Sequence, residues 1–429
     1  MQRMEEARPI RGQILDLLAQ RGMREPCYAG LLDLTIGLFE ERGLGADYYG
    51  YHNVTHELEV AYVALLAAGA AADGVGARDL AHIYMAALLH DFDPAKSVDK
   101  PHEEEVLRFV DGDARVRRMM AEAGADPRAV RALILATAYP MDAAAGRRLG
   151  DGLAWAGAGE AARLRGMGRY LSVADRVAGY AMGGPARGME LAKMNAHALA
   201  WRPSVIVRRA VEYFEQLLGP EAPVSNAVLG RLPGRMRRNF FATVQRFMEI
   251  RQKEISVQEG HVHGSLRLVP CIEGAAARRD PAFEAAVRDI HAELPRPLRF
   301  GDARFAESLA DPRTIVTTLR VGGRSGEIVG FAKGGPLEGY ELRPGIDDEN
   351  LGLGNTVFLE PLALKVGYWG IRGGSEMRHM FVMQASSMGY EYLTSFALRD
   401  VIEGRVGREG AEFVARFDPE RWDYYRIRI

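Results

Sequence analysis

Apolar residues recur every three to four positions through about the first 250 residues, which is the period of an amphipathic α-helix. This pattern predicts helices over residues 10–22, 27–43, 52–71, 77–93, 102–110, 127–139, 159–183, 205–219 and 232–254. Several of these segments end at glycine, a common helix stop. Strand-like alternation is almost absent here, so we expect an all-α helical bundle.

The pattern changes after Glu254, where short runs rich in β-branched and aromatic residues begin. Strands are predicted over residues 265–270, 314–321, 326–334, 355–366 and 392–398, with helices over 281–294, 302–311 and 375–389. Strands mixed with helices in this order predict an α/β domain. The chain is therefore expected to be multi-domain, with a helical domain over 1–255 and an α/β domain over 256–429.

The composition narrows the classes of protein further. With 48% hydrophobic and 26% charged residues and a net charge of −2, the chain has no basic field for a nucleic-acid polymer. Its two cysteines, Cys27 and Cys271, give no disulfide framework and suit a reducing cytoplasm. No run of about twenty apolar residues predicts a membrane span, and the first residues do not resemble a secretory signal.

Two histidines four positions apart, His52 and His56, begin the segment that carries the chemistry. Residues four apart share one face of a helix, so both could point to one site. A zinc protease would have Glu directly after the first His. Asn53 occupies that position, and Glu57 follows the second His instead. A zinc-protease site is therefore disfavoured, while packing or metal binding remains open.

Further residues of the type that ligates metals follow at the ends and centres of later helices. His90 and Asp91 are adjacent at the end of an apolar helix, whereas His82 on that helix carries no motif. Asp175 lies within an otherwise apolar helix, where a carboxylate is costly unless it is paired or binds a metal. Imidazoles and carboxylates together suit Zn²⁺, Mn²⁺, Fe²⁺ or Mg²⁺.

The order His, His-Asp, Asp on successive helices resembles the HD-domain metal-dependent phosphohydrolases. Residues 51–56, Tyr-His-Asn-Val-Thr-His, are similar to the signature of class I cyclic-nucleotide phosphodiesterases, and residues 134–140 to a helix of the same enzymes. The metal ligands that this resemblance implies are His56, His90, Asp91 and Asp175. It also implies that His52 is the catalytic proton donor to the leaving oxygen.

The chain departs from the phosphodiesterase pattern after the His-Asp pair, because the later histidine of that pattern is missing. Asp93 and His102 are candidates for a second shell or a second metal. The glutamine that holds the purine in the phosphodiesterases has only Gln245 as a weak counterpart. The predicted substrate is accordingly a small-molecule phosphoester, with a nucleotide or cyclic nucleotide favoured.

The second domain resembles the GNAT acyltransferase fold, in which a bulged central strand leads to a loop at a helix N-terminus. The resemblance implies that this loop binds the pyrophosphate of coenzyme A. In the register Gly370-Ile371-Arg372-Gly373-Gly374-Ser375, the residues expected to bind the cofactor are Gly370, Arg372, Gly373 and Gly374. Glu360 on the central strand is a candidate base, and Tyr424 or Tyr425 near the C-terminus is a candidate acid.

Three functional hypotheses follow from these motifs. The first is a cytoplasmic metal-dependent phosphohydrolase that uses metal-bound hydroxide, with an appended acyltransferase-like domain. The second is an acyl-CoA-dependent N-acyltransferase that uses the helical domain as a scaffold. The third is a non-catalytic module that senses a nucleotide or an acyl-CoA. The sequence leaves room for a homo-oligomer in each case.

Overall fold

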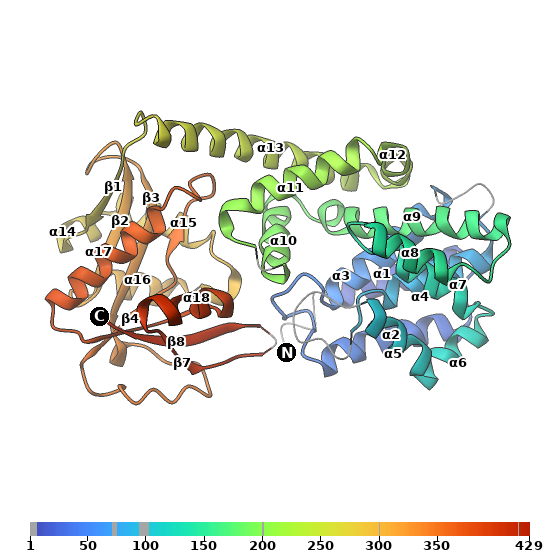
Figure 1. Cartoon of the computed structure of the whole chain (residues 1–429), viewed down its shortest axis with the longest axis horizontal. Helices are drawn as coiled ribbons and strands as arrows, with labels where there is room; N and C mark the ends of the chain where they lie inside the picture. The colour runs from blue at the N-terminus through green and yellow to red at the C-terminus, as the bar shows by residue number, and fades with distance from the viewer. Residues whose placement is uncertain (1–6, 71–74, 94–102, 200, 300, 419) are drawn as a thin grey trace. The chain divides into compact units, whose positions relative to one another are not determined.

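A computed structural model of the chain describes residues 7–70, 75–93, 103–199, 201–299, 301–418 and 420–429 (Figure 1). The chain divides into two compact units. Unit 1 comprises Met1–Trp201 and Ile206–Met248, and unit 2 comprises Arg202–Val205 and Glu249–Ile429. The boundary expected between residues 255 and 256 lies inside helix α13, in the part of this helix that belongs to unit 2.

The described part of unit 1 is mostly helical, which confirms the prediction for the N-terminal region. Its helices are α1 (Ala7–Gln20), α2 (Pro26–Glu41), α3 (Val54–Ala67), α4 (Ala77–Leu89), α5 (Glu103–Gly112), α6 (Ala114–Glu122), α7 (Pro127–Ala136), α8 (Ala143–Gly152), α9 (Ala158–Met182), α10 (Pro185–Ala198), α11 (Pro203–Leu218), α12 (Ala222–Arg231) and α13 (Gly234–Val262). A short 3₁₀ turn, Ala68–Ala70, follows α3. The first residues of α11 and the C-terminal part of α13 are counted with unit 2.

The core of unit 1 is built around α3, α4 and α9, which pack against one another and carry buried residues on most of their faces. The Tyr170 hydroxyl on α9 donates a hydrogen bond to the carbonyl of Ala64 on α3. The C-terminal half of α9, together with α3 and most of α4, is buried on nearly all sides, as expected for helices in the centre of a bundle. Buried polar side chains in these segments therefore contact other protein groups.

Unit 2 contains a mixed sheet of eight strands. The strands are β1 (Leu268–Ile272), β2 (Ile315–Val321), β3 (Ile328–Pro336), β4 (Thr356–Leu359), β5 (Ala363–Leu364), β6 (Tyr392–Leu398), β7 (Glu412–Ala415) and β8 (Trp422–Arg428). Their order is β1-β2-β3-β4-β6-β8-β7, and β5 pairs with β3. All pairs are antiparallel except β4 with β6, which are parallel.

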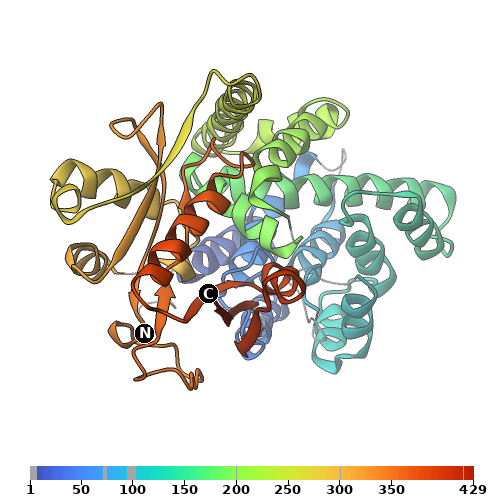
Figure 2. The same ribbon diagram turned by 60° about the vertical axis from the view of Figure 1, so that its left-hand side comes forward.

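Helices cover both faces of this sheet, as Figure 2 shows with the strands seen nearly edge-on. One face packs against α17 (Gly373–Ser387) and α18 (Arg399–Glu409), and the other against α15 (Pro281–His291) and α16 (Asp302–Ala310). The remaining short elements are α14 (Ala275–Arg278) and the 3₁₀ turns Arg296–Leu298 and Leu337–Gly339. This three-layer arrangement agrees with the mixed α/β domain expected from the sequence.

The central strand differs from the single strand predicted over residues 355–366. It is divided into β4 and β5 by Glu360-Pro361-Leu362, and both parts pair with β3. Between the pairs Gly334↔Leu359 and Phe331↔Ala363, three residues of the central strand face two of β3. One extra residue opposite a continuous strand is a β-bulge, and Pro361 cannot donate a ladder hydrogen bond there.

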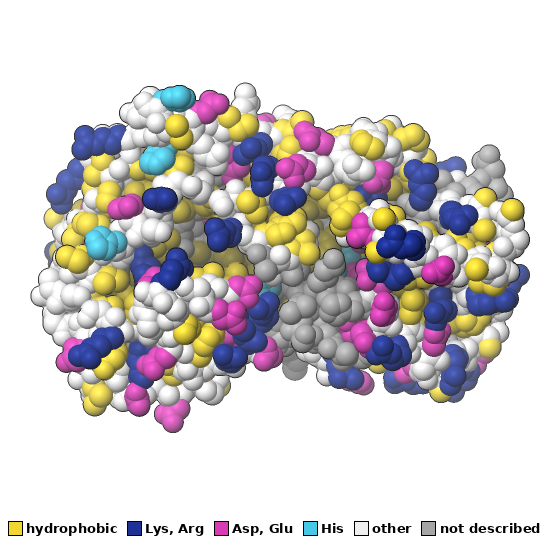
Figure 3. Space-filling model, viewed as in Figure 1, with side chains coloured by type: hydrophobic (Ala, Val, Ile, Leu, Met, Phe, Trp, Pro, Cys, Tyr) yellow, Lys and Arg dark blue, Asp and Glu magenta, His cyan; other side chains and the backbone are white. Residues whose placement is uncertain are grey.

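The described surface carries both signs of charge. Figure 3 shows Lys and Arg interspersed with Asp and Glu on the visible face, in keeping with the net charge of −2. Among the described residues, no helix combines the length and the hydropathy needed to cross a bilayer.

Candidate functional site

Asn53 fixes where α3 begins and thereby where the two histidines of the motif lie. Its side-chain oxygen accepts hydrogen bonds from the backbone N–H groups of Thr55, at 2.9 Å, and His56, at 3.1 Å. Its amide donates to the carbonyl of Gly50 at 2.7 Å. Asn53 is therefore the N-cap of α3, so His56 lies in the first turn, whereas His52 precedes the helix. The predicted helix over 52–71 began two residues too early.

His90 and Asp91 lie at the C-terminal end of a helix, α4. His90 is the C-cap residue of α4, and its side chain is only 1% exposed. The backbone N–H of Asp91 donates to Glu57 Oε1 on α3 at 3.0 Å. The end of α4 is thus fastened to the first turn of α3, which brings the His-Asp pair beside His56.

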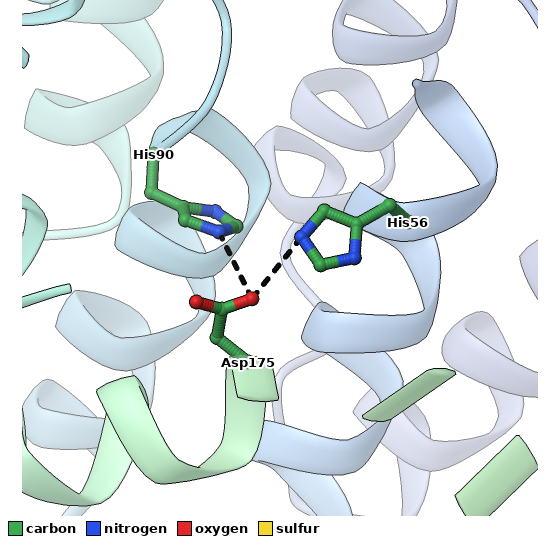
Figure 4. A group of neighbouring side chains, drawn as sticks. All are labelled: His56, His90 and Asp175. Atoms are coloured by element: carbon green, nitrogen blue, oxygen red, sulfur yellow. Dashed lines mark ion pairs between the residues drawn. The ribbon is translucent and has the colours of Figure 1, made fainter. Parts of the chain in front are cut away.

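Asp175 reaches the same place from the middle of α9. Its Oδ1 atom lies 3.1 Å from His56 Nε2 and 3.7 Å from His90 Nε2, as Figure 4 shows. The neighbouring residues of α9 are buried and mostly apolar, so the carboxylate finds compensating partners at this cluster.

Asp91 completes the cluster. Its Oδ2 atom lies 3.3 Å from both His56 Nε2 and His90 Nε2. Ligand atoms about 2.1 Å from one ion, at angles between 90° and 109°, are roughly 3.0–3.4 Å apart. The four separations between a histidine Nε2 and a carboxylate oxygen, 3.1–3.7 Å, are close to this range, and the three residues whose ligand atoms all lie within 4.8 Å of one another are His56, His90 and Asp175. The structure thus brings together the residues that the sequence suggested as metal ligands, and their distances fit a divalent ion.

The hydrogen-bonding state of the two histidines supports this fit. Both Nε2 atoms are buried and have no hydrogen-bond partner among the described residues. A buried nitrogen that faces carboxylates without a hydrogen bond costs free energy unless an ion or another group satisfies it. His56, His90 and Asp175 also form a group whose ligand atoms all lie within 4.8 Å of one another.

The charges of the cluster shift the pKa values of its members when no ion is bound. Burial lowers the pKa of His56, but the adjacent carboxylates of Asp175 and Asp91 outweigh it and raise this pKa to about 10. Burial also opposes the charged form of Asp175, yet the two histidines lower its pKa to about 2. The cluster therefore holds paired charges, and a divalent cation would replace protons on the imidazoles.

The other residues predicted for this site lie around the cluster. His52 Nε2 is 4.0 Å from Asp91 Oδ2, close enough to share its surroundings but outside the three-residue group. Its role as a proton donor stays a prediction. Asp93 is buried after the end of α4, and His102 lies outside the described residues.

Glu57 is a site residue that sequence reasoning missed. Its side chain is 0% exposed, and its Oε2 atom lies 2.9 Å from His90 Nδ1. The sequence contained one signal for it, because a glutamate within a helix that is apolar on most faces requires a buried partner. Its position directly after His56 drew attention only to the missing protease motif.

In unit 2 the sheet opens beside the bulge. The pairing of β4 with β6 ends at Phe358↔Thr394, whereas β6 continues to Leu398 beside β8. Among the described strands, the β4-facing edge of β6 after Thr394 therefore has no ladder partner. Backbone N–H and C=O groups along this edge are available to a ligand with amide groups.

The glycine-rich segment lies directly before α17. Arg372 is the N-cap residue of α17 and has φ of 60°, a left-handed conformation that glycine adopts most readily. Gly370 has φ of 86° and is exposed, as is Arg372. Gly373 and Gly374 form the first turn of α17, where amide N–H groups lack intrahelical partners. These positions stay predictions as cofactor-binding residues.

Glu360 lies at the bulge and belongs to a buried polar group. Its carboxylate forms an ion pair with Lys333 on β3 and accepts a hydrogen bond from the Tyr340 hydroxyl at 2.8 Å. Lys333 is fully buried and also donates to Ser308 Oγ at 2.5 Å. Burial lowers the pKa of Lys333, although Glu360 opposes this effect. Sequence reasoning identified Glu360 but neither of its partners.

Tyr424 lies in the core of unit 2. Its hydroxyl donates to Asp348 Oδ2 at 2.8 Å, and burial raises its pKa. The ring of Phe358 stacks on Tyr424 and also contacts Tyr340, whose hydroxyl binds Glu360. Tyr424 and Tyr340, the partner of Glu360, thus both contact the ring of Phe358.

Comparisons with known proteins add the following. No family model matches the chain, and no curated protein matches it. Among solved structures, it is similar to a GNAT family N-acetyltransferase from Escherichia coli in complex with CoA, at 17% identity. This match covers 38% of the chain and 82% of the acetyltransferase, with a TM-score of 0.27.

Two other solved structures resemble the chain to a similar degree. An IAA acetyltransferase from Bacillus cereus is 13% identical to this chain, and the match covers 38% of this chain and 100% of the acetyltransferase, with a TM-score of 0.25. An aminoglycoside 6′-N-acetyltransferase complexed with coenzyme A is 17% identical to this chain. The match covers 37% of this chain and 93% of that enzyme, with a TM-score of 0.25.

These matches correct the enzyme class expected from the histidine motif. The expectation was an HD-type phosphohydrolase, whereas the matching structures are acetyltransferases. The phosphohydrolase prediction is therefore contradicted, and its phosphoester substrate and metal-bound hydroxide mechanism are not carried further. The contacts among His56, His90, Asp91 and Asp175 are geometric observations and do not depend on that assignment.

Proposed function

We propose that unit 2 binds an acyl-CoA in the opening between β4 and β6 and transfers the acyl group to an amine. The observation that carries this proposal is the separation of the two parallel strands after the pair Phe358↔Thr394. The pantetheine arm of coenzyme A contains two amides, which can pair with the unpaired edge of β6 as an added strand would.

The segment before α17 supports the same binding mode. Amide N–H groups at a helix N-terminus bind phosphate oxygens, and the helix dipole favours negative charge there. Gly373 and Gly374 form the first turn at this end, and the side chain of Leu319 leaves no space for a Cβ at Gly373. The exposed guanidinium of Arg372 adds a positive charge beside these amides.

The transfer itself requires few protein groups. The amine nitrogen attacks the thioester carbonyl, the C–S bond breaks, and coenzyme A leaves as a thiolate that takes up a proton. The proton lost by the amine is accepted by a base, for which Glu360 at the bulge is the candidate. Its ion pair with Lys333 and its hydrogen bond from Tyr340 hold the carboxylate in one orientation.

Calorimetry with coenzyme A and acetyl-CoA tests the binding step. We expect saturable binding that Arg372→Glu weakens by about tenfold, because the new charge repels the pyrophosphate. Arg279→Glu, an exposed change of the same charge elsewhere in unit 2, is the matched control and should bind as the unaltered protein does. Absence of heat and of any thermal shift with either ligand would refute the proposal.

A panel of amines tests the transfer step. Release of free thiol from acetyl-CoA is followed with each amine, and the acylated product is identified by mass spectrometry. We expect thiol release to depend on a particular amine. Binding of acetyl-CoA without transfer to any amine would instead identify unit 2 as an acyl-CoA-binding module.

A second function is favoured by a separate observation in unit 1. We propose that His56, His90, Asp91 and Asp175 bind one divalent metal ion. The buried Nε2 atoms without hydrogen-bond partners carry this proposal, because they face two carboxylates at distances that fit shared coordination. Nitrogen and oxygen ligands suit Zn²⁺, Fe²⁺ or Mn²⁺, with Mg²⁺ less favoured by the two imidazoles.

Metal quantitation on the purified protein tests this second proposal. We expect about one ion per chain, loss of that ion on chelation, and recovery when a divalent ion is added back. A protein that contains no stoichiometric ion and binds none of Zn²⁺, Mn²⁺, Fe²⁺ or Mg²⁺ in titration would exclude a metal centre in unit 1.

A further inference from the structure

Glu57 connects the two helix ends that supply His56, His90 and Asp91. It lies in the first turn of α3, directly after His56, and is fully buried. Its Oε1 atom accepts a hydrogen bond from the backbone N–H of Asp91 at 3.0 Å, and its Oε2 atom lies 2.9 Å from His90 Nδ1. One carboxylate thus contacts both members of the His-Asp pair.

The surroundings of His90 Nδ1 decide which ring nitrogen carries the proton. Two acceptors lie next to this atom, Glu57 Oε2 at 2.9 Å and the carbonyl of Ala87 at 3.0 Å. Both can only accept, so Nδ1 must be the donor and carry a hydrogen. In the neutral ring, Nε2 then has its lone pair free, and this is the atom that faces Asp91 and Asp175.

We infer that Glu57 is a positioning residue of the proposed metal centre, which together with the carbonyl of Ala87 holds His90 in the tautomer that presents Nε2 to the ion. The inference rests on the proposed metal binding in unit 1. Carboxylates that accept a hydrogen bond from a ligating histidine orient the ring and raise its basicity. Glu57 also holds the backbone of Asp91, so one residue sets the direction of two ligands.

The same contacts argue against Glu57 as a ligand of a second ion. Glu57, His90 and Asp91 form a second group with ligand atoms within 4.8 Å of one another. Glu57 Oε1, however, already accepts the backbone N–H of Asp91. Its Oε2 atom lies 2.9 Å from His90 Nδ1 as an ion pair, while the ring nitrogen is hydrogen-bonded to the carbonyl of Ala87. Glu57 therefore acts through the His-Asp pair, and the centre formed by the described residues takes one ion.

The substitution Glu57→Gln distinguishes a positioning role of the carboxylate from a role in packing alone. The amide has nearly the same shape, but only one of its two terminal atoms accepts hydrogen bonds. If its oxygen faces the N–H of Asp91, its NH₂ group faces His90 and favours the tautomer with the hydrogen on Nε2. If the amide is reversed, two donors meet at Asp91. Either orientation disturbs one ligand of the ion.

The test is a titration of the metal-free full-length protein with Zn²⁺, followed by calorimetry. We expect one ion per chain, and binding 10- to 100-fold weaker in Glu57→Gln, as for other carboxylates behind a ligating histidine. Glu59→Gln is the matched control. Glu59 is a buried glutamate on the same helix, paired with Arg187 at 2.5 Å, and its loss should reduce stability while leaving zinc affinity within about twofold.

Nitrogen-15 spectra of the histidine-labelled, zinc-loaded protein provide a readout that a purely structural role would not change. His90 should show a protonated Nδ1 and a metal-bound Nε2, and Glu57→Gln should alter this pair of signals. Glu57→Asp keeps the charge but shortens the reach by one methylene, so it should also bind zinc more weakly. It replaces Glu57→Gln if that variant does not fold.

The outcomes separate the inference from the proposal beneath it. If the unaltered protein binds no ion, the metal centre itself is refuted. If it binds one ion and Glu57→Gln binds it equally well, with unchanged His90 signals, the positioning role is refuted while the metal centre stands. If it binds two ions and Glu57→Gln loses one, Glu57 is a ligand, which also overturns the inference.

Discussion

His56 Nε2 and Asp175 Oδ1 lie 3.1 Å apart, although one comes from the first turn of α3 and the other from the middle of α9. The contact depends on the packing of these two buried helices against each other. It places a carboxylate within the cluster where an ion would otherwise have only imidazoles and Asp91.

Asp175→Asn should therefore reduce the bound metal to below about a tenth of an ion per chain, because a neutral amide is a far weaker ligand than a carboxylate. Metal content after purification and after re-addition of Zn²⁺ checks this. His82→Asn is the control, since His82 is also buried on the helix that ends at His90 but faces Asp126. Equal metal content in Asp175→Asn and the unaltered protein would contradict the assignment.

Asn53→Ala should destabilise unit 1 by about 1 kcal/mol, because the N–H groups of Thr55 and His56 lose their acceptor. His56 lies in that first turn, so zinc affinity should fall as well. Asn53→Asp keeps the capping oxygen and should retain most of the stability. Urea unfolding and zinc titration of both variants provide the measurement, and equal effects of the two substitutions would argue against the capping role.

Removal of Lys333 alone should destabilise unit 2 by about 3–5 kcal/mol, because Glu360 would stay buried without its counter-charge. Lys333→Met combined with Glu360→Met should cost less than the sum of the single substitutions. A double-mutant cycle of urea unfolding measures this coupling. Additive effects would show that the two side chains do not stabilise each other.

His82 stabilises unit 1 above about pH 6.5, the usual pKa of histidine, and this contribution should be lost on acidification, opposite in sign to the contribution of His56, whose pKa is raised. His82 Nε2 accepts a hydrogen bond from the backbone N–H of Asp126 at 2.9 Å, which requires the neutral ring. Burial lowers its pKa, and Arg78 and Arg163 add to this, while Asp79 and Asp126 oppose it. Below the unfolded pKa the unfolded chain binds more protons, so the contribution is present above it and lost on acidification.

Unfolding midpoints in urea between pH 7.5 and 5.5 check this dependence. His82→Asn removes the titrating ring, so the difference in stability between the unaltered protein and this variant should be largest at pH 7.5 and shrink toward pH 5.5. A profile with the same slope in both proteins would assign the loss of stability to other groups.

Local patterns in the sequence were sufficient for the classes of element and for the candidate ligands. Helical periodicity located α3, α4 and α9, and the resemblance of the histidine motif to HD-domain enzymes implied that His56, His90, Asp91 and Asp175 share a site. The bulge was not visible as a break in the strand pattern, because residues 355–366 are β-rich on both sides of Pro361. Its register against β3 is a property of the sheet.

The sequence alone determined the helical and mixed α/β character of the two parts and the residue types at the cluster, because periodicity and composition act locally. Only the tertiary structure showed that Glu57 holds His90 and Asp91, and that Lys333 and Tyr340 hold Glu360. These partners lie far apart in the chain. Their contacts arise where buried polar groups must find one another during packing, and no local pattern encodes which pairs will meet.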